Sequence, residues 1–244
     1  MARDLTRMMR AERHETDYGE KLDYRLYVPD LALDTRYPLV VFEHGSGERG
    51  DDNLAQLRYG VPALFEHVHD VEPAFLLAPQ CPRGMRWSNV NGRVRVDAPL
   101  PEFPSLPQKL TIELLDELLE RHPIDRDRVY ATGLSLGGFG CWDLIMRRPD
   151  AFAAALLVCG GGDPSQAGRI AHIPQWIFHG DADAVIPVAH SQHMVAALTA
   201  AGAAPRYTEY PGVGHDAWTL TYRNAEALEW LFAQRREATQ LARN

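Results

Sequence analysis

The chain has 244 residues, of which 45% are hydrophobic, 24% charged and 9% aromatic. This apolar share is typical of a globular protein and excludes a disordered or collagen-like chain, and a chain of this length buries enough surface to fold without disulfides or structural metals. The 25 Lys and Arg residues against 33 Asp and Glu residues leave a net charge of −8, which repels a phosphate backbone and argues against a nucleic-acid partner.

The first residues and the cysteines predict where the protein resides. The opening sequence MARDLTRMMRAERHE has basic residues without the apolar core of about 7 to 15 residues that a secretory signal carries. No apolar run approaches the roughly 20 residues of a membrane helix. The three cysteines, Cys81, Cys141 and Cys159, lie among apolar residues without zinc-type spacing, which indicates buried, reduced thiols. We therefore expect a cytoplasmic protein without a membrane partner.

The first half of the chain predicts three strands and one helix. Residues 21–28 (KLDYRLYV) alternate between polar and apolar side chains, which predicts an antiparallel strand at the edge of a sheet. Residues 39–42 and 75–78 are apolar on both faces, as in buried parallel strands. The leucines between residues 110 and 119 mark the apolar face of a helix that ends before Pro123.

In the second half, strands and helices alternate regularly. The predicted strands are residues 129–132, 153–158, 176–178 and, as a more polar candidate near the sheet edge, 207–210. The predicted helices are residues 136–148, 188–201 and 225–236. This alternation predicts an α/β fold with a mostly parallel central sheet and helices on both faces. Because no repeat or linker interrupts the chain, we expect a single domain over residues 1–244.

Residues 133–138 (GLSLGG) lie where a predicted strand ends and a helix begins. On such a sharp turn the glycines allow close backbone approach, and the serine hydroxyl is lifted into the open. The N-terminus of the following helix offers free N–H groups to a developing oxyanion. We therefore interpret Ser135 as a nucleophile; the alternative is a serine that only caps the helix.

A serine hydroxyl needs a base to take its proton, and the base needs a third group to orient it. His190 and His193 fall within a predicted helix, and His179 lies at a strand end. His215 occupies a glycine-flanked loop, GVGHD, between the last predicted strand and the last helix. It is the best candidate for the base, with a solvated loop histidine as the alternative.

The acid is expected in the loop after residues 176–178. Asp181 and Asp183 both lie there, in the sequence HGDADAVIP, and either carboxylate could accept a hydrogen bond from an imidazole. Asp163, on the preceding loop, is a more distant candidate. The residues alone leave this choice open.

The order Ser135, Asp183, His215 resembles that of the α/β-hydrolase superfamily. Residues 42–50 (FEHGSGERG) are similar to the H-G-x-G-E-R-G loop of its esterases related to dienelactone hydrolases and predicted peptidase-like esterases. The similarity covers nearly the whole chain. In that family the acid is the fifth residue of H-G-x-x-D-x-x-V/I-P, which corresponds to Asp183. The resemblance further implies an oxyanion hole formed by the backbone N–H groups of Ser46 and Leu136.

The spacing of these residues predicts an open site. Ser135 and Asp183 are 48 positions apart, and this segment must hold a helix, two strands and a connection, which leaves no room for a cap domain. Two histidine pairs, at positions 67 and 69 and at 190 and 193, have metal-like spacing but no well-placed third ligand. We expect surface histidines there, and no metal.

Residues 83–88 (RGMRWS), followed by Arg93 and Arg95, concentrate arginines in an acidic protein. Trp87 could offer a flat apolar face to a ring, and Arg86 could hold a carboxylate in a bidentate contact. The alternative is that Trp87 packs beneath the loop while Arg86 points to solvent. Trp218 is a third candidate for contacting the substrate.

The interpretation is a serine carboxylesterase that acts on small to medium esters through an acyl-enzyme intermediate, without a cofactor. The alternatives are a peptidase or acyl-peptide hydrolase of the same fold, and a non-catalytic ligand-binding protein. The acyl group, the alcohol group and the oligomeric state are left open, because fold analogy does not determine a substrate.

Overall fold

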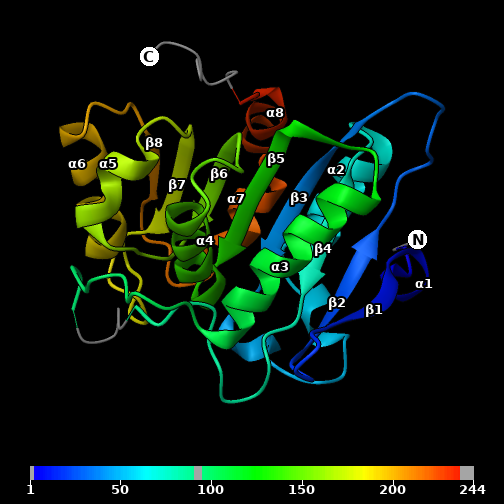
Figure 1. The fold of residues 1–244 in the computed structure, drawn as a ribbon. Coiled ribbons are helices and arrows are strands. Elements are labelled where there is room, and N and C mark those ends of the chain that lie inside the picture. The colour runs from blue at the N-terminus through cyan, green and yellow to red at the C-terminus, as the bar shows by residue number, and fades with distance from the viewer. Residues whose placement is uncertain (1–2, 91–94, 237–244) are drawn as a thin grey trace, which may run out of the picture.

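The computed structural model describes residues 3–90 and 95–236, so Arg93 lies outside the described residues. Within them an eight-stranded sheet crosses the molecule in the order β1-β2-β4-β3-β5-β6-β7-β8 (Figure 1). The strands are β1 (Arg10–Glu15), β2 (Lys21–Tyr27), β3 (Tyr37–Glu43), β4 (Phe75–Pro79), β5 (Ile124–Leu134), β6 (Ala154–Val158), β7 (Gln175–Gly180) and β8 (Arg206–Tyr210). The β1–β2 and β2–β4 pairs are antiparallel, and all other pairs are parallel.

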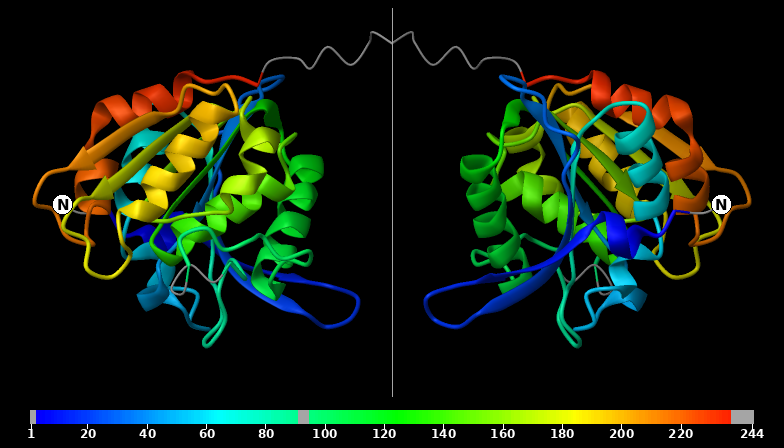
Figure 2. Two further views of the ribbon diagram at one scale, coloured as in Figure 1. Left: turned by 90° about the vertical axis from the view of Figure 1, so that its left-hand side faces the viewer. Right: turned by 90° about the vertical axis from the view of Figure 1, so that its right-hand side faces the viewer.

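Helices cover both faces of this sheet (Figure 2). One face carries α3 (Leu106–Arg121), α4 (Leu136–Arg147), α5 (Ala167–Ile170) and α6 (Ala189–Ala200). The other carries α1 (Leu5–Met8), α2 (Val61–Asp70), α7 (Trp218–Arg223) and α8 (Ala225–Ala233). Short 3-10 helices are η1 (Ser46–Glu48), η2 (Ala55–Leu57) and η3 (Pro164–Gln166).

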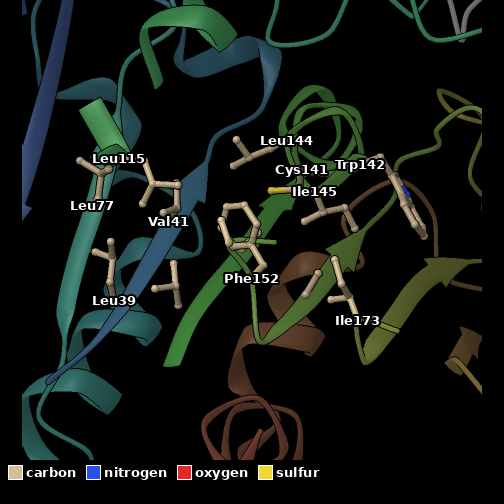
Figure 3. Packing of buried hydrophobic residues seen from close by; sticks show 14 of the residues in the cluster. Leu39, Val41, Leu77, Leu115, Cys141, Trp142, Leu144, Ile145, Phe152 and Ile173 are labelled. Atoms are coloured by element: carbon tan, nitrogen blue, oxygen red, sulfur yellow. The ribbon is translucent and has the colours of Figure 1, made fainter. Parts of the chain in front are cut away.

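The strands have two apolar faces because each helix layer encloses a core of its own. In β3, Leu39 and Val41 point into one core, whereas Val40 and Phe42 point into the other. Figure 3 shows the first core, in which Leu39 and Val41 lie on the strand side and residues such as Leu144 on the helix side. The near-continuous apolar character of the central strands follows from this double burial.

The α/β fold with a mostly parallel sheet is confirmed, as are the predicted strands and helices, with shifted ends. The prediction that residues 21–28 form the sheet edge is wrong, because β1 pairs outside β2. The sequence of β1, RAERHE, is largely exposed and has no apolar alternation, so its pattern gave no strand signal. Helix α2 was not predicted either, although its buried residues Val61, Leu64, Phe65 and Val68 have helical spacing.

Between Ser135 and Asp183 the chain forms α4, β6, η3, α5 and β7, and residues 3–90 and 95–236 contain no separate cap domain. Cys81, Cys141 and Cys159 are buried and free of disulfides, as predicted. In the described part of the chain, no helix combines the length and apolar character needed to cross a membrane.

Candidate active site

Three side chains meet at the carboxyl ends of β5, β7 and β8. Parallel strands bring these ends to one edge of the sheet, where loops can place side chains from distant parts of the chain together. His215 Nε2 lies 2.8 Å from Ser135 Oγ, and His215 Nδ1 lies 2.6 Å from Asp183 Oδ2. The structure therefore brings the serine, the histidine and one of the two candidate aspartates into a single hydrogen-bonded chain.

Ser135 occupies a strained turn between β5 and α4. Its φ of 54° and ψ of −115° lie in a region that costs a non-glycine residue about 1–3 kcal/mol, and such strain gathers at functional sites. Its side chain makes no capping hydrogen bond to α4, which argues against the helix-cap interpretation. A Cβ at Gly137 would lie 1.8 Å from Glu43 O, so only glycine lets α4 begin this close to β3.

Asp183 is 8% exposed, and both of its carboxylate oxygens are hydrogen-bonded. The backbone N–H groups of Val185 and Ile186 donate to Oδ1 at 2.8 and 2.9 Å, and His215 Nδ1–H donates to Oδ2. Burial opposes the charge, but the hydrogen bonds from His215, Ile186 and Val185 outweigh it and hold the pKa of this carboxyl below its usual value. Asp183 is thus an ionised acceptor facing the imidazole.

The other two candidate aspartates face elsewhere. Asp181 is exposed, and its Oδ1 accepts a hydrogen bond from Gly212 N at 2.7 Å. Asp163 accepts hydrogen bonds from Leu100 N and Ser165 N, at 2.8 and 2.9 Å. Both carboxylates therefore organise loops and do not orient the imidazole.

The loop after β3 lies beside Ser135. Ser46 is the first residue of η1 and Leu136 the first of α4, and both line one cavity with Ser135. The first N–H groups of a helix have no acceptor within it, so both can face a ligand. Beneath them His44 donates from Nδ1 to Gly45 O at 2.6 Å and accepts at Nε2 from Cys81 N at 2.9 Å. Burial lowers the pKa of His44 to about 4, so the imidazole that links Gly45 O and Cys81 N is neutral.

The cavity that contains Ser135 has a volume of about 140 Å³, below the roughly 300–1,000 Å³ of pockets for drug-sized ligands. Phe139, Val185 and Ile186 form an apolar part of its lining. Arg49 and Arg86 also line it, and among the described residues no acidic side chain does. The cavity is therefore small, half apolar and positively charged.

The two arginines are held differently. Arg49 donates to Ser46 O at 2.9 Å and to Met85 O at 3.0 Å, which links the loop after β3 to residues 83–88. Arg86 is exposed, and its side chain makes no hydrogen bond or ion pair with the described residues. Its guanidinium is therefore free to meet a ligand in the cavity.

Trp87 and Trp218, both candidates for contacting the substrate, do not line this cavity. For Trp87 the structure shows the alternative, a ring packed beneath the loop. Trp87 is fully buried, and its indole N–H donates to His44 O at 3.0 Å, because the large ring gains more from burial than from exposure on a loop. The ring of Trp218 lies nearly perpendicular to the His215 imidazole, with the ring centroids 5.1 Å apart, and it lines a second cavity with Tyr59.

His179 was weighed from the sequence only as a candidate base, and its contact with the acid was not predicted. It is fully buried near the end of β7, with Nε2 3.3 Å from Asp183 Oδ2. The sequence signal that could have indicated this contact is the position of His179 in the segment HGDAD, four residues before Asp183. Within residues 3–90 and 95–236, Cys159, His179 and Asp183 are the group with three potential metal ligands within 4.8 Å of one another; the histidine pairs at 67 and 69 and at 190 and 193 form no such group.

Comparisons with known proteins agree with this architecture. Residues 107–240, more than half of the chain, match the model of the dienelactone hydrolase family. The chain therefore belongs to the dienelactone hydrolase family and has an α/β-hydrolase fold.

Two solved structures illustrate the likeness. A thermostable esterase known from a crystal structure matches with 42% sequence identity and a TM-score of 0.88 over 95% of this chain, which spans 64% of that protein. A ferulic acid esterase shares the fold at 15% identity, with a TM-score of 0.66, over 92% of this chain and 97% of its own. No curated protein matches the chain by sequence.

Proposed function

We propose that this chain is a serine carboxylesterase that hydrolyses small to medium carboxylic esters through an acyl-enzyme intermediate. The observation that carries the proposal is the hydrogen-bonded chain from Ser135 through His215 to Asp183, which begins at a strained strand-to-helix turn. Membership of the dienelactone hydrolase family and the similarity to a thermostable esterase support it.

In the proposed reaction, Ser135 Oγ attacks the ester carbonyl carbon while His215 Nε2 takes the hydroxyl proton. Asp183 accepts from Nδ1–H, which keeps the Nε2 lone pair directed at the serine and stabilises the imidazolium that forms. The tetrahedral intermediate then expels the alcohol, which receives the proton from His215. Water attacks the acyl-enzyme by the same path, releasing the acid and restoring Ser135.

The backbone N–H groups of Ser46 and Leu136 are the proposed oxyanion hole. Both residues line the cavity beside Ser135, and both begin a helix, so their N–H groups lack intrahelical acceptors. Two such donors stabilise the charge that develops on the carbonyl oxygen, and losing one donor of this kind typically costs about 10²–10³ in kcat.

The cavity favours short esters that carry a negative charge. Arg49 and Arg86 supply two guanidinium groups, and the cavity lining formed by residues 3–90 and 95–236 includes no acidic side chain that would repel an anion. The volume of about 140 Å³ limits how much of a long chain is buried, and each methylene left outside forgoes about 0.8 kcal/mol. We expect rates to fall for acyl chains of about ten carbons or more. We also expect no jump in rate above the solubility limit of the ester, because the described residues form no cap that has to open.

The proposal is tested with a fluorophosphonate probe and with p-nitrophenyl acetate. The expected result is one labelled serine, identified by peptide mass spectrometry as Ser135, together with ester hydrolysis that Ser135→Ala abolishes. Ser165→Ala, which alters an exposed serine at η3, is the control and should behave as the wild type. Absence of both labelling and hydrolysis would favour a non-catalytic protein, and faster cleavage of peptide anilides than of esters would favour a peptidase.

A further inference from the structure

His179 is fully buried near the end of β7, and it lies four residues before Asp183. Both of its ring nitrogens have partners. Nδ1 lies 2.7 Å from Ser191 Oγ, on α6. Nε2 lies 2.9 Å from Ile186 O and 3.3 Å from Asp183 Oδ2.

These partners determine the tautomer of the ring. The carbonyl of Ile186 and the carboxylate of Asp183 can only accept, so Nε2 must carry a proton. The Ser191 hydroxyl lies 2.7 Å from Nδ1 and 3.3 Å from Gly160 O, so it donates over the shorter distance to an unprotonated Nδ1. Burial lowers the pKa of His179, which agrees with a neutral ring holding its single proton on Nε2.

The Asp183 carboxylate is therefore approached from four directions. Val185 N and Ile186 N donate to Oδ1, and His215 Nδ1 and His179 Nε2 face Oδ2. We propose that His179 is a positioning residue, which shares its Nε2–H between Ile186 O and Asp183 Oδ2 and so keeps the carboxylate aimed at His215. This inference rests on the proposed function, in which Asp183 is the acid of the triad.

The main chain of Ile186 completes the brace. Its N–H donates to Asp183 Oδ1, and its carbonyl accepts from His179 Nε2. The imidazole is in turn anchored to α6 through Ser191. The loop that carries Asp183 is thus tied to both the strand before it and the helix after it, and the same Ile186 lines the cavity beside Ser135.

Such a brace matters because the acid sits on a loop. The terminal torsion of an aspartate is broad, so the carboxylate turns easily unless its oxygens are held. A displacement of about 1 Å in a catalytic group can cost on the order of 10²-fold in rate. A donor behind Oδ2 restricts this rotation without contacting the substrate.

Two amide variants test the proposal. Glutamine at position 179 reaches as far as Nε2 and can still donate to Asp183, whereas asparagine reaches only as far as Nδ1 and retains the Ser191 contact alone. We expect His179→Asn to lower kcat on p-nitrophenyl acetate about ten- to a hundredfold, with KM within about twofold, and His179→Gln to stay within about threefold of the wild type. The downfield proton resonance of the His215–Asp183 hydrogen bond should move or broaden in His179→Asn only.

Gln175→Leu is the control, because it removes a buried hydrogen bond, to Ile170 O at 2.7 Å, from the opposite end of the same strand. It should change the free energy of unfolding without changing kcat. Equal kcat losses in His179→Asn and His179→Gln, or a loss of stability alone in His179→Asn, would overturn the positioning role. Hydrolysis that survives Ser135→Ala would instead refute the proposed function, and the proton resonance would still report on the His179 contact.

Discussion

On one side of the cavity Asp183 and His215 reach Ser135 through hydrogen bonds of 2.6 and 2.8 Å, whereas on the other side residues 83–88 present Arg86 and turn Trp87 into the core. The first side consists of buried polar groups that must be paired, since an unpaired buried polar group costs about 1–3 kcal/mol. On the second side, the exposed guanidinium of Arg86 lines the cavity, whereas the buried ring of Trp87 packs in the core. Changes on the first side should therefore abolish chemistry, and changes on the second should alter stability or recognition.

The ring of Trp87 shows how the second side supports the first. Its N–H donates to the carbonyl of His44, directly before the loop that carries Ser46, and its own carbonyl accepts from the Ser105 hydroxyl at the start of α3. These two hydrogen bonds hold residues 83–88 from the buried side, and Arg86 is among the residues of this loop that stay exposed.

The largest effect is expected at the hydrogen-bonded side. Ser135→Ala and His215→Ala should each lower kcat by about 10⁵–10⁶, and the double variant should be little worse, because the residues act as one unit. Steady-state kinetics on p-nitrophenyl acetate measure this. A single variant that keeps more than about a tenth of the wild-type turnover would contradict the proposed roles.

The two aspartates of the same loop provide a matched pair. Asp183→Asn should no longer hold the His215 imidazole in the tautomer that carries its proton on Nδ1. We expect kcat to fall by up to roughly 10⁴-fold, as in other triads. Asp181→Asn keeps an oxygen that can accept from Gly212 N and removes only a negative charge, at an exposed position, so it should leave kcat nearly unchanged. The reverse order in the measured kcat values would assign the acid to Asp181.

On the other side, Trp87→Ala should lower the free energy of unfolding by about 3–5 kcal/mol, because it empties a fully buried ring site. Urea denaturation measures the change, and KM of the folded fraction should stay the same. Met85→Ala, in the same loop but 39% exposed, is the control and should cost less than about 0.5 kcal/mol. A raised KM without loss of stability would mean that the ring faces the substrate after all.

The buried, neutral imidazole of His44 predicts that the free energy of unfolding falls at acidic pH, by an amount between the effects above and below. The pKa of this imidazole falls from 6.5 to about 4 on burial, so below pH 6.5 the unfolded chain binds a proton that the folded chain does not. Stability should therefore be lost as the pH falls from 6.5 towards 4, by about 2–3 kcal/mol from this residue. Urea denaturation at pH 7 and pH 4.5 should show a smaller loss in His44→Gln than in the wild type; equal losses would exclude His44 as the source.

The smallest effect is expected at Arg86. Arg86→Ala should raise KM about tenfold for p-nitrophenyl hydrogen succinate and leave KM for neutral p-nitrophenyl butyrate unchanged, because only the charged ester loses a partner. Arg83→Ala is the matched control, since Arg83 is exposed, faces Asp51 at 3.6 Å and does not line the cavity. Equal changes for both esters would exclude a carboxylate contact.

Much of this molecule was predictable because the signals are local. Apolar runs, helical spacing and a glycine-flanked serine between a strand and a helix each occupy a few neighbouring residues, and they sufficed for the α/β fold and for singling out Ser135 and His215. The strand β1 escaped prediction because its exposed sequence RAERHE becomes a strand only by pairing with β2. An edge strand with no buried face does not need alternating polar and apolar residues, so its sequence lacks the pattern from which strands are predicted.

The sequence by itself determined the order of seven of the eight described strands and of four helices, α3, α4, α6 and α8, together with the residue types at the strand ends, since these depend on short-range spacing. The spacing of residues left Asp181 and Asp183 as alternatives, and the family resemblance pointed to Asp183. Only the tertiary structure showed the contact between Asp183 and His215, decided whether Trp87 faces the cavity or the core, and revealed that His179 contacts Asp183. These outcomes depend on the direction of a side chain after distant segments have packed. Burial and hydrogen bonding between such segments set that direction, and neither is contained in the spacing of residues along one chain.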